Sequence, residues 1–172
     1  DSYPMGGRAV GVTGNWDVMP RLAQEISTDH ATYIEVIKNW LVEQNIPEPV
    51  VEINQILHVD IEGDGTDEIL ISASHFVEPT GHSVAVGDYS VIIMRKVVGN
   101  SVETILIVAD YYYQAVEIQF PLTYAAIFVA DLNGDSILEV LIGVERWEGN
   151  GVIVYDVNGT NVQMDFNIIC GL

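Results

Sequence analysis

The sequence predicts a mainly β protein made of two similar four-stranded antiparallel units, preceded by a segment that contains one helix. Three observations support this prediction: an internal repeat, eight apolar runs separated by turn residues, and one stretch with helical spacing. The chain has 172 residues, of which 49% are hydrophobic and 18% charged. This length and composition fit one compact domain with a real core.

The repeat is the strongest of these observations. Residues 56–72 align without gaps to residues 127–143, an offset of 131 − 60 = 71 positions. Residues 91–103 align with residues 152–163, and each of these segments contains a glycine turn. The shorter second offset places an insertion at residues 77–88 of the first copy. The repeated unit is therefore longer than its best-matched loop.

Apolar runs divide each copy into four expected strands. Such a unit has the strand content of a propeller blade, although a sandwich would use similar strands, so we expect two blade-like sheets that form a partial β-propeller. Two blades cannot close a ring, so we expect them to pack on each other or on neighbouring molecules. The expected strands are residues 55–61, 68–76, 89–98 and 102–113, then 124–132, 139–147, 151–157 and 161–170.

The first 54 residues differ from the repeated units. Apolar residues recur at helical spacing between residues 30 and 45, where Thr28 or Asp29 can cap a helix and Pro47 prevents its continuation. We expect residues 1–54 to form a loop and helix segment that packs on the β units. The first repeat then covers residues 55–113 and the second residues 124–171, all in one compact domain.

The charge of the chain limits its partners. There are 25 Asp and Glu residues against 6 Lys and Arg, a formal net charge of −19. Nucleic acids and anionic membranes repel such a field, whereas cations are attracted. No apolar run reaches the about 18 residues that span a bilayer. The sequence also begins without signal-peptide features, so we expect an already processed secreted protein whose single cysteine, Cys170, has no partner within the chain.

Two acidic loops carry the candidate chemistry, one in each repeat. Oxygen side chains stand at loop positions 1, 3, 5 and 9, and position 7 would offer a backbone carbonyl. Calcium needs six or more oxygen ligands, which alternate residues of a tight loop can supply. We therefore expect two calcium sites. The first would use Asp60, Glu62, Asp64, Thr66 and Glu68, and the second Asp131, Asn133, Asp135, Ile137 and Glu139.

The loops are not EF-hands, because position 12 is Ile71 or Ile142 instead of a bidentate Glu. The pattern of strand, acidic loop and strand resembles the FG-GAP or VCBS repeats of integrin α-subunit propellers and of secreted bacterial proteins. The resemblance implies a blade-like fold and calcium between adjacent strands. Glu62 and Ser136 depart from the family pattern, and a Ser where Gly is usual predicts a weaker or strained second site.

Other interpretations stay open. The loops could be acidic turns without a metal. Ser83 lies in a sequence similar to a nucleophile elbow, and His75, His82 and Asp88 could bind zinc. The tyrosines at 111–113 could join Trp147 in a sugar-stacking surface, and Trp16 with Asp17 could help close a site.

The expected function is that of a calcium-binding extracellular β module that acts in binding, adhesion or self-assembly and is not an enzyme. One alternative is a structural subunit of an extracellular fibre or surface layer. Another is an accessory domain or a hydrolase that uses carboxylates or a metal. The expected partners are calcium, the chain itself through sheet edges at residues 151–157 or 161–170, or another extracellular protein or glycan.

Overall fold

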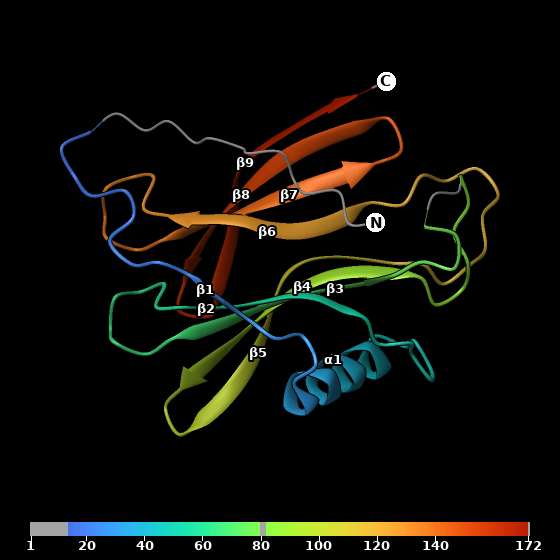
Figure 1. The fold of residues 1–172 in the computed structure, drawn as a ribbon, viewed down its shortest axis with the longest axis horizontal. Helices are drawn as coiled ribbons and strands as arrows, with labels where there is room; N and C mark the ends of the chain where they lie inside the picture. Colours follow the sequence, from blue (N-terminus) through green and yellow to red (C-terminus); the bar gives the residue numbers. More distant parts are fainter. Residues whose placement is uncertain (1–13, 80–81, 172) are drawn as a thin grey trace.

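A computed structural model describes residues 14–79 and 82–171 and places one helix and nine strands among them (Figure 1). The predicted mainly β class is confirmed. Eight strands begin and end within two residues of the predicted ranges. The elements are β1 (Gln24–Ile26), α1 (Ala31–Glu43), β2 (Ile53–Val59), β3 (Glu68–His75), β4 (Tyr89–Val98), β5 (Ser101–Tyr111), β6 (Thr123–Ala130), β7 (Glu139–Arg146), β8 (Gly149–Asn158) and β9 (Asn161–Gly171).

The strands form two antiparallel sheets, ordered β1-β2-β3-β4-β5 and β6-β7-β8-β9. The second sheet has the predicted four strands, but the first has five. Its extra strand is β1, which pairs with β2 from Gln24 opposite His58 to Ile26 opposite Ile56. Neither sheet closes on itself among the described residues, so the structure contains two open sheets.

The two sheets pack face to face around one apolar core (Figure 1). Alternate residues of each strand point into this space, as the two-residue period of a strand requires. Because the inward residues of β3, β4, β7 and β8 are almost fully buried, their register is strongly specified. The core includes Leu57, Leu70, Ile92 and Met94 from the first sheet and Val129, Val140, Ile142 and Ile153 from the second.

The helix covers the opposite face of the first sheet (Figure 1). Ile37 and Leu41, one helical turn apart, are fully buried in a second core cluster that also contains Ile71 and Ile93. No helix in the described part of the chain has the length and apolarity needed to cross a membrane.

The start of the helix differs from the prediction. His30 is the N-cap, and its side chain makes no capping hydrogen bond. Neither Thr28 nor Asp29 caps the helix; Asp29 instead accepts a hydrogen bond from the Ser27 hydroxyl. The side-chain oxygen that could have capped the helix is thus directed to a local turn.

Functional features lie at two ends of the stacked sheets. The β2–β3 and β6–β7 loops, which carry the acidic sequences, lie together at one end (Figure 1). The insertion before β4 and the segment before β6 lie together at the other end, where Val84 and Val116 form an isolated antiparallel bridge. The fold therefore brings the two repeated loops side by side.

Candidate cation site at the paired acidic loops

The two acidic loops are in direct contact. The backbone N–H of Leu138, just before β7, donates to the carbonyl oxygen of Ile61, just after β2, over 2.9 Å. Both residues are fully buried. A buried backbone hydrogen bond therefore joins the two loops.

In the first loop, position 1 organises the backbone. The Asp60 carboxylate accepts N–H groups from Gly63, Asp64 and Gly65 at 2.7, 3.1 and 3.0 Å. The Asp64 carboxylate accepts the N–H of Thr66 at 2.8 Å. These bonds close the loop into a tight turn around its own acidic side chains.

The second loop repeats this arrangement. The Asp131 carboxylate accepts N–H groups from Gly134 at 2.6 Å and Ser136 at 3.0 Å. Asp135 accepts the N–H of Ile137 at 2.8 Å, as Asp64 does for Thr66 in the first loop. The sequence repeat is thus also a repeat of backbone geometry.

Ser136 adopts a left-handed backbone conformation that is strained for a residue with a side chain. Its φ is +74°, and the matching residue of the first loop is Gly65, with φ of +87°. A side chain with a Cβ is strained in this left-handed region, whereas glycine is not. The strain expected from the sequence at this position is therefore present in the structure.

The glutamates at position 9 lie beneath the loops. Glu68 and Glu139 are each only 2% exposed. Glu68 accepts the N–H of Ile61 at 2.9 Å, and Glu139 accepts the N–H of Leu132 at 2.6 Å. Each loop therefore contains a buried carboxylate. This carboxylate is hydrogen-bonded to a backbone N–H just after the preceding strand.

A buried lysine side chain pairs with two glutamates of the first loop. Lys96, on β4, is 7% exposed, and its Nζ lies 2.7 Å from Glu62 Oε2 and 2.9 Å from Glu68 Oε1. Burial acts to lower the pKa of Lys96, but the hydrogen bonds and charges of the two glutamates outweigh this and raise it. The other Glu62 oxygen accepts the N–H of Gly159 from the β8–β9 turn. The ammonium group thus supplies a positive charge to the two glutamates of the first loop.

The position equivalent to Lys96 in the second sheet is Asp156. Arg95 pairs with Ile69 as Tyr155 pairs with Val140, so the next residue on each strand lies beside the position-9 glutamate. Burial raises the pKa of the Asp156 carboxyl, and the charges of Asp165 and Asp135 raise it further. The second loop therefore faces a carboxylate where the first faces an ammonium group.

The acidic side chains of the second loop gather negative charge without an ion pair among the described residues. Burial raises the pKa of Glu139, its backbone hydrogen bonds lower it, and the charges of Asp135 and Asp131 raise it again, with a net rise. Within residues 14–79 and 82–171, no Lys, Arg or His forms an ion pair with an acidic side chain of this loop. The side-chain amide of Asn133 lies between Asp135 and Glu139 and donates to both, at 3.1 and 2.8 Å.

Trp16, which precedes β1 in the chain, packs against the second loop. Its indole Nε1 donates to the carbonyl oxygen of Asp131 at 3.0 Å. Its ring packs over Gly134, where an added Cβ would lie 3.2 Å from the ring. The N–H of Asp131 in turn donates to the carbonyl of Val18 at 2.9 Å. The aromatic residue considered in the sequence for closing a site thus lies against the second loop.

Arg21 joins the two loops. Its Nε donates to the carbonyl of Asp60 at 2.5 Å, and its Nη2 donates to the carbonyls of Ile61 at 3.0 Å and Ser136 at 2.6 Å. Sequence reasoning missed Arg21, because nothing local links it to a loop 39 residues away. It also missed Lys96, although the repeat alignment itself pairs Lys96 with Asp156.

The oxygen donors suit a hard cation, but they are directed to backbone amides as placed. Among the described residues, no three His, Cys, Asp or Glu side chains converge closely enough to hold a metal ion. The second loop still offers the carboxylates of Asp131, Asp135 and Glu139, the amide of Asn133 and the nearby Asp156. These are the ligand types that Ca²⁺ prefers.

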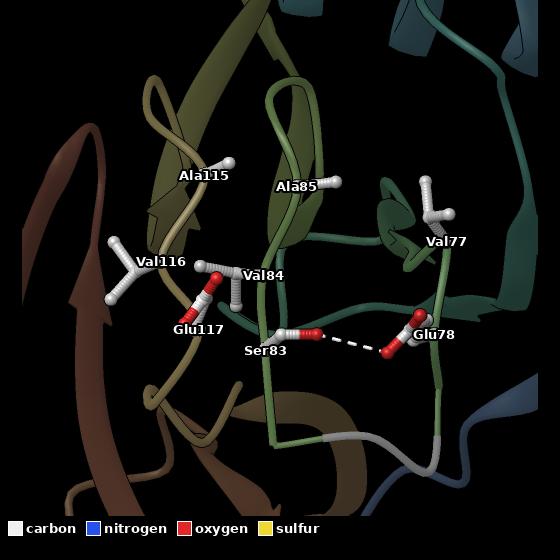
Figure 2. Close-up of a pocket in the computed structure, with 8 residues that line it drawn as sticks. All are labelled: Val77, Glu78, Ser83, Val84, Ala85, Ala115, Val116 and Glu117. Carbon is white, nitrogen blue, oxygen red and sulfur yellow. Dashed lines mark hydrogen bonds between the residues drawn. The ribbon is translucent and has the colours of Figure 1, made fainter.

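The other candidates are not assembled into sites. Ser83 lies in a pocket of about 320 Å³ at the opposite end of the sheets, where its hydroxyl donates to Glu78 at 2.9 Å (Figure 2). His82 does not face this serine as a base; its ring contacts Phe120 and Trp147, with centroids 5.4 and 4.3 Å apart. The described residues thus contain no serine–histidine pair at this pocket.

The residues considered above for a zinc site and a sugar surface have other partners. His75 pairs with Glu52 at 3.0 Å, while Asp88 accepts backbone N–H groups of the insertion. The Tyr111 hydroxyl accepts the indole N–H of Trp40 at 2.7 Å, so this tyrosine fastens the helix to the sheet.

Comparison with known proteins adds no assignment: no family model, curated protein or solved structure matches the chain.

Proposed function

We propose that this protein is a calcium-dependent β module of extracellular binding, adhesion or assembly, that it is not an enzyme, and that its second acidic loop holds the cation. The observation that carries the proposal is the exchange of charge between equivalent positions. Lys96 pairs with Glu62 and Glu68 in the first loop, and Asp156 adds a negative charge beside the second.

The electrostatic argument starts from burial. Asp131 and Glu139 are each 2% exposed, and Asp135 and Asp156 carry charge nearby. Carboxylates that share a poorly hydrated site repel one another, and a cation removes that repulsion. In the first loop the Lys96 ammonium already does this for Glu62 and Glu68. The second loop has the same frame and needs the same charge from a bound ion.

Calcium is the cation that best fits the donors. The carboxylates of Asp131, Asp135 and Glu139, the amide oxygen of Asn133 and the carbonyl of Ile137 would hold it, with Asp156 as a further acidic ligand. The bound ion would supply positive charge and link the two strands that flank the loop.

This proposal reverses the order of sites expected from the sequence. The first loop, with Asp60, Glu62, Asp64, Thr66 and Glu68, would be stabilised chiefly by Lys96 and would bind calcium weakly or not at all. The second, strained at Ser136, would be the principal site. The relation to FG-GAP or VCBS blades remains part of the proposal; it is supported by the two repeated sheets and the acidic loop between the first two strands of each unit.

Calcium titration of chelator-stripped protein tests the proposal. We expect a calorimetric signal and a rise in melting temperature with calcium, and a much smaller effect of magnesium, which prefers octahedral sites and keeps its water. Asp131→Asn should abolish most of the rise, and the matched change Asp60→Asn should leave it.

If calcium up to about 10 mM, roughly tenfold beyond the weak end for extracellular modules, gave no heat and no change in melting temperature, the proposal would be overturned. Equal losses in Asp60→Asn and Asp131→Asn would overturn the assignment to the second loop.

A further inference from the structure

Strand β9 is an unprotected edge of the second sheet. It has 11 residues and, among residues 14–79 and 82–171, pairs only with β8, so within this part of the chain alternate backbone N–H and C=O groups along it lack a strand partner (Figure 1). The expected candidate at residues 151–157 is not an edge, because β8 pairs with both β7 and β9.

The other three edges are less suited to strand addition. β1 has only three residues, and β6 contacts β3 and β4 of the first sheet. β5 is long but carries Glu103 and Asp110, whereas β9 carries only Asp165. Charged residues are a usual protection of natural edges, and β9 largely lacks this protection.

The apolar surface beside this edge continues to the edge itself. Phe128, Leu141, Val154 and Phe166 form one cross-strand row on the face that points away from the first sheet. Leu141 is 3% and Val154 9% exposed, but Phe166 is 53% exposed. Its neighbour along the edge, Ile168, is 50% exposed. The row is therefore buried on β7 and β8 and exposed on β9.

Charge determines which partner can approach. Residues 149–171 contain two acidic residues and no basic ones, so 23 of the 25 acidic residues lie elsewhere. Two copies of a chain with charge −19 repel each other over most of their surfaces. The β8–β9 hairpin is a part through which they can meet with little local repulsion. A basic partner would instead be drawn to the acidic parts of the surface.

We infer that β9 pairs antiparallel with β9 of a second copy, around a two-fold axis at Asn167, and joins the two second sheets into one of eight strands. This register places Phe166 opposite Ile168 of the second copy, and Ile168 opposite its Phe166. Such aromatic and β-branched cross-strand pairs stabilise sheets. It also offsets the two Asp165 residues by four positions, about 13 Å along the strand, beyond the Debye length at 0.15 M salt.

The pairing does not depend on the cation site. One bound Ca²⁺ changes the formal charge only from −19 to −19 + 2 = −17. Salt should therefore strengthen association more than calcium does, because it screens the remaining charge. Asp131→Asn should still associate, so failure of the calcium proposal and failure of this one can be distinguished.

Two variants with matched exposure test the surface. Phe166→Lys adds a charge to β9, and Val102→Lys adds one to β5, where Val102 is 52% exposed. By sedimentation in about 0.5 M salt, the wild type should be a dimer, and Phe166→Lys should raise its dissociation constant at least about tenfold. Val102→Lys should leave the constant unchanged. A monomeric wild type at about 100 µM protein, or equal effects of both variants, would overturn the inference.

Cysteine crosslinking tests the register. Cys170 is the only cysteine, so Cys170→Ser gives a clean background. On that background Asn167→Cys should form an intermolecular disulfide under mild oxidation, because the two copies of residue 167 face each other at the axis. Ser101→Cys, on exposed β5, is the control. Crosslinking at position 101 equal to that at 167 would overturn the proposed pairing.

Discussion

Lys96 and Asp156 hold equivalent positions beside the two acidic loops, one on β4 and one on β8. The backbone frame around them is repeated, whereas the charge is inverted. In the first loop an ammonium group lies 2.9 Å from the buried Glu68, and in the second a carboxylate faces Asp135. In the first repeat the buried position-9 glutamate therefore has a counter-charge from the chain itself, and in the second it has a carboxylate neighbour instead.

Asp156→Lys should make the second loop independent of calcium. The new ammonium group would lie where Lys96 lies in the first unit and pair with Glu139. In chelator the variant should unfold at a higher temperature than the wild type, and calcium should raise that temperature no further. Thermal unfolding with and without chelator measures both. Glu103→Lys makes the same charge change on β5, and an equal effect there would reduce the result to net charge.

Lys96→Met should destabilise the protein strongly in chelator. It leaves Glu68, 2% exposed, without its counter-charge, and breaking a buried ion pair costs about 3–5 kcal/mol. Urea unfolding measures the loss. Added calcium should restore part of the stability, because the first loop would then resemble the second. Lys38→Met, on the helix surface, is the control; a similar loss there would contradict the role given to Lys96.

Ser136→Gly should stabilise the protein by about 1 kcal/mol, because glycine adopts a φ of +74° without the steric cost of a Cβ. The reciprocal change Gly65→Ser, at φ of +87°, should destabilise the first loop by a similar amount. Chemical denaturation of both variants gives the comparison. A destabilised Ser136→Gly variant would mean that the serine side chain contributes more than its backbone strain costs.

Tyr89→Phe should change the alkaline stability of the protein. Burial, chiefly, raises the pKa of Tyr89 to about 12, and its hydroxyl bonds to the Glu52 N–H and the Val50 carbonyl. A folded-state pKa above the usual 10.0 gives stability that is present below pH 10 and lost as pH rises towards 12.

The variant should therefore lose about 1–3 kcal/mol at neutral pH, from the two unsatisfied partners, but show a shallower decline from pH 10 to 12. Denaturation curves across this range measure the slope. An unchanged slope would mean that other buried tyrosines dominate the alkaline transition.

Most of the sheet structure could be predicted, because long apolar runs and glycine turns are local signals. Gly99 and Gly159, both with positive φ, end β4 and β8 where the sequence places turns. β1 was missed because three residues carry no readable period. The helix cap was wrong because Asp29 had two possible partners, and sequence alone does not rank the Ser27 hydroxyl above a helix amide.

The acidic loops could be located from spacing, but their charge balance could not. Lys96 is 28 residues from Glu68 in sequence and reaches it only because β4 pairs with β3. Arg21 precedes the helix, and its side chain donates hydrogen bonds to backbone carbonyls of both loops. Such contacts depend on tertiary arrangement. The exchange of Lys96 for Asp156 was nevertheless readable from the repeat once side chains, and not only apolar positions, were compared.

The three carbonyl contacts of Arg21 have a consequence for the order of folding. Its acceptors belong to the β2–β3 loop and to the β6–β7 loop, so the full set can form only after both sheets have docked. These hydrogen bonds report completion of the fold and contribute little to its early, local steps. Removing them should speed unfolding far more than it slows refolding. Arg21 therefore contributes to kinetic stability by slowing the unfolding of the folded protein.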